Sequence, residues 1–121
     1  MENIYKKRCN ELLKQGDYKG YHYAIVTYGS HPCAYIKVKG ITDDDIYVHG
    51  GITFEGDEVA EWFPELPKGY YIGWDYAHAG DYVFLSGGIT MSTIYDKKWN
   101  VDEIFEEVKS AIDQIEAVKG E

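Results

Sequence analysis

The sequence predicts a single α+β domain, in which a mainly antiparallel sheet carries an N-terminal helix and a long C-terminal amphipathic helix packed on it. Three observations predict this class. The first segment has helical spacing, the middle holds short runs rich in Tyr, Ile and Val between Gly-containing turns, and the last segment is helical again. A chain of 121 residues suits one core. We therefore expect residues 1–121 to form one domain.

The N-terminal helix is expected over about Glu2 to Gln15. Its apolar side chains recur at the spacing i, i+4, i+7 and i+8, at Tyr5, Cys9, Leu12 and Leu13. The positions between them hold residues that favour helices. The Gly16-Asp17 pair that follows is expected to end the helix.

The middle of the chain is expected to form the sheet, because its apolar runs are short and bounded by turn residues. Alternation is clearest in Ala34–Lys39, where Ile36 and Val38 share one face and Lys37 and Lys39 share the other. The predicted strands are Tyr21–Tyr28, Cys33–Lys39, Ile46–His49, Ile52–Phe54, Tyr70–Tyr76 and Tyr82–Ser86.

The C-terminal helix has the strongest local signal. Asn100 is a preferred capping residue, and Glu103 stands three positions later, as in a capping box. A helix from about Val101 to Val118 is expected. One continuous apolar face should pack on the sheet, formed by Val101, Ile104, Phe105, Val108, Ala111, Ile112 and Ile115.

Charge restricts the classes of partner. The chain has 12 basic and 21 acidic residues, a formal net charge of -9, and Arg8 is the single arginine. The electrostatic field of this negative charge repels the backbone of nucleic acids and anionic membrane surfaces. We therefore expect no direct binding to duplex nucleic acid and no membrane association. It favours a basic protein partner, although acidic solubility alone explains the same balance.

The two cysteines, Cys9 and Cys33, are far apart and form no metal-binding or redox motif. No apolar run approaches the length of a membrane span, and the charged N-terminus lacks the apolar stretch of a signal peptide. The predicted location is the cytoplasm, which is that of the host cell if the gene is viral.

One polar cluster follows the last predicted central strand. Asp75, His78 and Asp81 bring two carboxylates and an imidazole close together in sequence, and they are the candidate ligands for a divalent metal, with His49 as a fourth. The same groups suit acid-base chemistry, but no nucleophile or nucleotide-binding loop accompanies them. The alternative is a turn in which these side chains bind the backbone. No cofactor is expected, and a divalent metal stays an alternative.

A second segment, His49–Phe54, contains paired glycines whose amides can approach a ligand or simply form a tight turn. If both segments line one cleft, aromatic rings would stack on a base while the amides and Thr53 hold polar groups. The candidate ligand-binding residues are His49, Gly50, Gly51, Thr53, Phe54, Trp74, Asp75, Tyr76, His78, Asp81 and Tyr82.

In these two segments the sequence resembles a family of small, mostly uncharacterised phage and prophage proteins. The shared elements are H-G-G-[IL]-T-[FY], matched here by His49–Phe54, and G-[FW]-D-x-A-H-x-G-D, matched by Gly73–Asp81, with a C-terminal helix after them. The resemblance runs from about Cys33 to that helix. It implies a phage setting, in which small accessory proteins often counter host defences.

Three functions follow as hypotheses. The first is a non-enzymatic counter-defence protein that sequesters a small nucleotide-derived immune signal of the cyclic nucleotide or ADP-ribose type, and a homo-oligomer could form its pockets between protomers. The second is an acidic inhibitor that binds a host defence protein, as acidic anti-CRISPR proteins do. The third is a metal-dependent hydrolase built on Asp75, His78 and Asp81.

Overall fold

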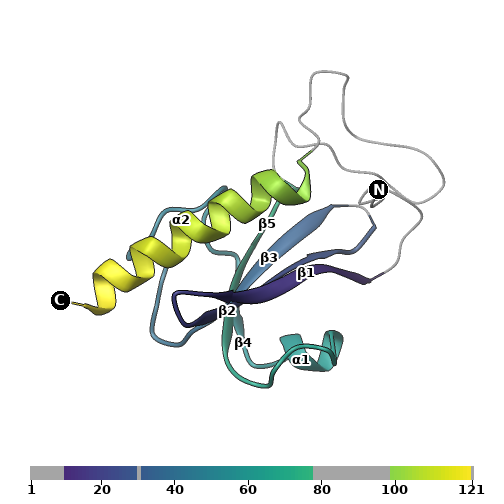
Figure 1. Cartoon of the computed structure of the whole chain (residues 1–121), viewed down its shortest axis with the longest axis horizontal. Helices are drawn as coiled ribbons and strands as arrows, with labels where there is room; N and C mark the ends of the chain where they lie inside the picture. The colour runs from purple at the N-terminus through teal and green to yellow at the C-terminus, as the bar shows by residue number, and fades with distance from the viewer. Residues whose placement is uncertain (1–9, 30, 78–98, 121) are drawn as a thin grey trace.

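The computed structural model describes residues 10–29, 31–77 and 99–120. They form a five-stranded antiparallel sheet in the order β1-β2-β3-β5-β4 with two helices, which confirms the predicted α+β class (Figure 1). The elements are β1 (Glu11–Tyr18), β2 (Tyr21–Thr27), β3 (Pro32–Lys37), β4 (Phe54–Gly56), α1 (Val59–Trp62), β5 (Tyr71–Asp75) and α2 (Val101–Lys119).

The predicted N-terminal helix is wrong over residues 11–15, which lie in β1; residues 2–9 of that helix lie outside the described residues. β1 pairs with β2 through a turn at Lys19 and Gly20, whose φ angles of 51° and 86° are left-handed. Leu12 packs on one side of the sheet and Leu13 on the other, because successive side chains of a strand point to opposite faces. A bulge shifts the register with β2 between Leu12 and Lys14. Cross-strand pairing thus overrides a local helical pattern.

The remaining predicted strands agree with the structure to different degrees. The sheet contains most of the residues predicted at 21–28, 33–39 and 70–76, whereas the strand predicted at 52–54 begins at Phe54 and continues to Gly56. Residues 46–49, predicted as a strand, form a loop and turn instead. The short helix α1 was not predicted, and the strand predicted at 82–86 lies outside the described residues.

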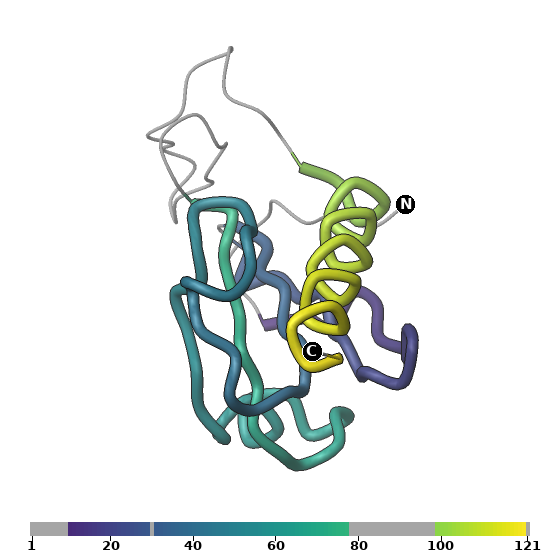
Figure 2. Tube along the Cα trace, turned by 90° about the vertical axis from the view of Figure 1, so that its left-hand side faces the viewer, coloured from purple at the N-terminus to yellow at the C-terminus, as the bar shows by residue number. Residues whose placement is uncertain are grey.

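Two apolar layers cover the two faces of the sheet, because successive side chains of a strand point to opposite sides. On the first face, Ile25, Ile36 and Ile72 pack with the helix α2, which lies alongside the sheet in Figure 2. On the second face, Val26 and Tyr71 belong to the cluster that contains Val59 of α1. We call these the α2 face and the α1 face.

The helix α2 confirms the predicted cap. The side chain of Asn100 accepts a hydrogen bond from the Glu103 amide at 2.9 Å, and the Glu103 carboxylate accepts one from the Asn100 amide at 3.2 Å. The helix runs to Lys119, one residue beyond the predicted end. Its fully covered side chains belong to the predicted apolar face and are Ile104, Val108, Ala111, Ile112 and Ile115.

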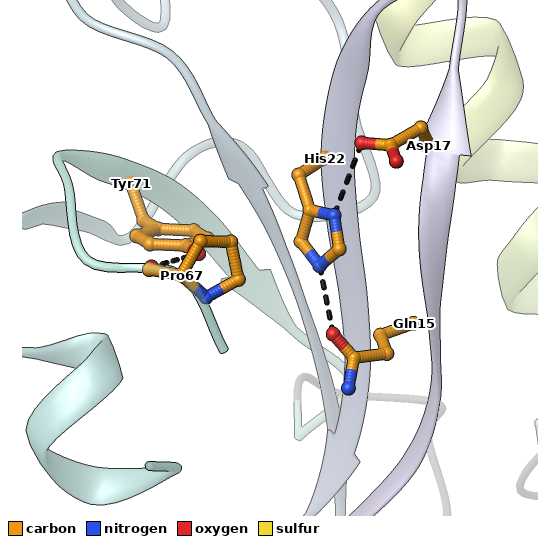
Figure 3. A network of polar contacts seen from close by, with 5 residues as sticks. All are labelled: Gln15, Asp17, His22, Pro67 and Tyr71. Atoms are coloured by element: carbon orange, nitrogen blue, oxygen red, sulfur yellow. Dashed lines mark hydrogen bonds and ion pairs between the residues drawn. The ribbon is translucent and has the colours of Figure 1, made fainter. Parts of the chain in front are cut away.

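Polar contacts join β1 to β2 and hold the connection that leads into β5 (Figure 3). The imidazole of His22 on β2 contacts Asp17 through Nδ1 at 3.1 Å and Gln15 through Nε2 at 2.8 Å, both on β1. The Tyr71 hydroxyl donates to the Pro67 carbonyl at 2.6 Å. These contacts fix the β1-β2 pair and the entry to β5.

Among the described helices, none is long and apolar enough to cross a membrane.

Candidate functional site

The two segments singled out in the sequence lie side by side. Phe54 pairs with Gly73 in the β4-β5 ladder, and the Thr53 amide donates to the Gly73 carbonyl at 2.9 Å. The Thr53 hydroxyl donates to the Asp75 carboxylate at 3.4 Å. Strand alternation nevertheless divides the candidate residues between the two faces of the sheet, so they form two groups rather than one.

The first group lies on the α2 face. The ring of His49 stacks on Tyr76, with centroids 4.9 Å apart and planes 8° from parallel, and both rings contact Trp99. The Trp74 indole donates to the Tyr76 hydroxyl at 2.9 Å, and that hydroxyl donates to the Glu107 carboxylate, which also accepts from the His49 amide at 2.9 Å. This chain of contacts joins the sheet to α2.

The paired glycines form a tight turn. Gly50 and Gly51 have φ angles of 70° and 83°, and the Gly51 amide donates to the Val48 carbonyl at 2.9 Å. The amide of Ile52 donates to the Asp43 carboxylate at 2.8 Å. A carboxylate of the chain itself therefore occupies the place where an external anion would meet the amide of Ile52.

The second group lies at a cleft on the α1 face. The cleft has a volume of about 460 Å³, within the range of small-ligand sites. Its described walls come from β3, β4, β5, α1 and the loop after β2. The lining residues are Asn10, Tyr28, His31, Cys33, Tyr35, Thr53, Phe54, Trp62, Trp74 and Asp75.

Aromatic rings dominate this cleft and meet at steep angles. The Phe54 ring lies 5.7 Å from Tyr35 at 87° and 5.3 Å from Trp62 at 57°. The hydroxyls of Tyr28 and Tyr35 are 2.6 Å apart and share a hydrogen bond. A Cβ atom at Gly73 would lie 2.4 Å from the Tyr35 ring, so the ring lies directly over the glycine. The missing side chain makes room for the cleft wall.

The described lining of the cleft holds one acidic side chain, Asp75, and one histidine, His31. Burial raises the pKa of Tyr28 to about 12 and raises the pKa values of Tyr35 and the Cys33 thiol, so these groups stay neutral. Asp75 supplies a carboxylate, which accepts from Thr53 and, at 3.2 Å, from the Ala77 amide. The described lining residues include no Lys or Arg.

The predicted site residues therefore lie in different parts of the structure. Thr53, Phe54 and Asp75 line the cleft, and Trp74 borders it while its indole bonds on the α2 face. The other described candidates belong to the α2-face group or the glycine turn, namely His49, Gly50, Gly51 and Tyr76. His78, Asp81 and Tyr82 lie outside the described residues, and the described part of the chain has no cluster of three metal-ligating side chains.

Sequence reasoning missed several residues of the cleft, including Tyr28, Tyr35 and Trp62. The sequence did contain a signal for Tyr35 and for Cys33, which was also missed. These two side chains alternate with residues of the opposite face, and Gly73 interrupts an aromatic strand later in the chain. Recognising that Tyr35 pairs with Gly73 requires the order of the strands, which local pattern does not contain.

No family model, curated protein or solved structure matches the chain.

Proposed function

We propose that this protein is a non-catalytic binding protein that captures a small ligand in the aromatic cleft of the α1 face. The observation that carries the proposal is the combination of a cleft of about 460 Å³, several aromatic rings and the Thr53-Asp75 pair at one edge. Rings supply stacking area, and a few convergent polar groups fix the orientation of a ligand. Of the candidate ligand-binding residues named from the sequence, Thr53, Phe54 and Asp75 keep that role in this proposal.

The ligand that we propose is nucleotide-derived, with its base in the cleft. Stacking on aromatic side chains stabilises any base, since every base has a π-face. The phosphates would stay outside, because the described lining residues include no Lys or Arg and the Asp75 carboxylate repels anions. In the phage setting that the sequence resemblance implies, such a protein would sequester a nucleotide immune signal by mass action.

The α2-face group has a different proposed role. Its rings and the Glu107 carboxylate contact one another rather than the cleft. We propose that His49 and Tyr76 hold β5 against α2, and thereby keep Asp75, the neighbour of Tyr76, at the edge of the cleft. This separation makes the two groups testable by different substitutions.

A thermal-shift screen tests the proposal, with cyclic dinucleotides, cyclic ADP-ribose isomers and mononucleotides as the probes. Trp62→Ala removes a partly exposed ring of the cleft, and Tyr47→Ala is the matched control, because Tyr47 is an exposed ring that does not line it. We expect one probe to raise the melting temperature of the wild type and the Tyr47→Ala variant, and to lose this effect in Trp62→Ala.

Recovery of the ligand then separates binding from catalysis. If the protein sequesters its ligand, mass spectrometry after denaturation of the complex recovers the probe intact. A probe converted by substoichiometric protein would instead support a hydrolase and contradict the proposal. A screen in which no probe changes the melting temperature would also contradict it.

A second candidate function is inhibition of a basic host protein. The segment around α1 carries exposed acidic side chains at Glu55, Asp57, Glu58 and Glu61, and the partly exposed Trp62 lies among them. An aromatic ring within a charged rim is a common arrangement at protein interfaces. This function predicts a protein partner whose binding weakens as salt increases, with no requirement for a nucleotide.

A further inference from the structure

Two tyrosine hydroxyls meet at the wall of the cleft, where the oxygens of Tyr28 and Tyr35 are 2.6 Å apart. Each hydroxyl carries one proton, and the hydrogen bond between them uses one of the two. We propose that the Tyr28 hydroxyl donates the other proton to an acceptor atom on the edge of the ligand's base, and that this contact determines which bases the cleft accepts. The inference rests on the proposed binding function.

The burial of Tyr35 sets the direction of the shared hydrogen bond. Tyr35 is 5% exposed, and its ring lies over Gly73 and at 87° to Phe54. Among the described residues, Tyr28 is the one hydrogen-bond partner of its hydroxyl. If Tyr28 were the donor, the Tyr35 proton would be buried without an acceptor, which folded proteins avoid because the desolvation of that group is not compensated. Tyr35 therefore donates to Tyr28.

Tyr28 is left with a proton that no described residue accepts. Its side chain is partly exposed and lines the cleft, so the O–H group is within reach of a ligand. The Tyr28 ring packs on buried Phe63 with centroids 5.9 Å apart, and the Tyr28 amide donates to the His31 carbonyl at 3.2 Å. These contacts hold the residue directly after β2, so the hydroxyl is a positioned donor.

The effect of the contact on the two phenols agrees with this direction. Burial is the largest cause that raises the pKa of both, that of Tyr28 to about 12, so both hydroxyls keep their protons at neutral pH. The hydrogen bond itself lowers the pKa of Tyr28 and raises the pKa of Tyr35, as expected when Tyr35 is the donor. A hydroxyl that accepts one hydrogen bond also becomes a stronger donor.

The consequence for the ligand is a required acceptor. A base that places a lone pair at the Tyr28 hydroxyl gains a hydrogen bond, whereas a base with a C–H or N–H group there leaves the donor unpaired once water is excluded. Stacking alone does not make this distinction, since every base has a π-face. Tyr28 is therefore a specificity-determining residue of the cleft.

Calorimetric titration with adenosine and its 1-deaza, 3-deaza and 7-deaza analogues tests the inference. Each analogue replaces one ring nitrogen by a C–H group and keeps the size of the rings, so it removes one acceptor at a time. We expect one analogue to bind the wild type about threefold to tenfold more weakly than adenosine does, which is the range of one neutral hydrogen bond. The other two should bind about as tightly as adenosine.

Two matched variants assign this difference to one hydroxyl. Tyr28→Phe and Tyr35→Phe each remove one hydroxyl and break the same hydrogen bond. We expect Tyr28→Phe to bind adenosine and the weakened analogue equally, because the donor is gone. Tyr35→Phe should keep the difference, because the Tyr28 hydroxyl still donates to the ligand. Thermal unfolding without ligand checks that both variants are folded, and the wild-type series needs no variant.

The outcomes separate this inference from the proposed function. If all three analogues bind the wild type as tightly as adenosine, or if the difference survives in Tyr28→Phe, the inference is wrong and the cleft is still a binding site. A difference that is lost in Tyr35→Phe also overturns it, because the buried hydroxyl would then be the donor. If another member of the nucleotide panel binds and adenosine does not, Tyr28→Phe must weaken that member by the same factor, and unchanged affinity overturns the inference. If no member binds, both the inference and the proposed function are wrong.

Discussion

Gly73 makes room for the ring of Tyr35, which lines the cleft. It pairs with Tyr35 on one side and with Phe54 on the other, and the Tyr35 ring lies over its backbone. A side chain there would displace the ring, so the cleft depends on an absent side chain. Asp75 stands two residues later on the same strand and therefore points to the same face.

Tyr76→Phe tests the separate role of the α2-face group. The substitution removes the acceptor of the buried Trp74 indole and a donor to Glu107. We expect the free energy of unfolding to fall by about 1–3 kcal/mol, the cost of leaving a buried polar group without a partner. Urea denaturation measures this change. Ligand affinity of the folded variant should stay within a few-fold of wild type, and a large specific loss of affinity would place Tyr76 in the binding site instead.

At the scale of elements, the C-terminal helix was predictable because its signals are local. The capping residues and the apolar face of α2 are all within one stretch of chain, and both appear in the structure. The β1 strand was not predictable in the same way. Leu12 and Leu13 fit a helical stripe, but they pack on opposite faces of the sheet, because their segment pairs with β2 as a strand and strand side chains alternate.

The cap of α2 gives a prediction at this scale. Asn100→Ala removes the acceptor for the Glu103 amide, and we expect a loss of about 0.5–2 kcal/mol in the free energy of unfolding. Asn100→Asp keeps an acceptor at the same position and should retain most of the stability. Chemical denaturation of the two variants provides the measurement, and equal stabilities would show that the cap contributes nothing.

The candidate site shows the same division between local and long-range information. The sequence indicated Thr53, Phe54 and Asp75, because glycine turns and polar clusters are visible locally. It did not separate them from His49 and Tyr76, which lie on the other face. That separation follows from strand alternation once the pairing of β4 with β5 is known.

For the whole molecule, the buried tyrosines link stability to alkaline pH. Burial raises the pKa values of Tyr28 and Tyr71 to about 12 in the folded chain, from the ordinary 10.0. Below pH 10 these phenols are neutral in both states, so their contribution is fully present. As pH rises from about 10 to about 12, the unfolded chain ionises first, and the free energy of unfolding should fall.

Urea midpoints measured at intervals between pH 9 and 12 would follow this loss of stability. For each phenol, a difference of one unit between the folded and unfolded pKa values corresponds to at most about 1.4 kcal/mol of unfolding free energy. Because Tyr28→Phe removes one of the two ionising phenols, it should make the decline shallower. A midpoint that does not change over this window would contradict the burial of these phenols.

The central claim is that the cleft on the α1 face binds the ligand, whereas the group on the α2 face holds the sheet against the helix. Amide chemical shifts in a titration with cyclic dinucleotides, cyclic ADP-ribose isomers and mononucleotides test this claim most directly. We predict that the largest changes occur at Thr53, Phe54 and Asp75, with Cys33 and Tyr35 beside them. Changes centred on His49 and Gly51 instead, or no changes with any of these probes, would contradict it.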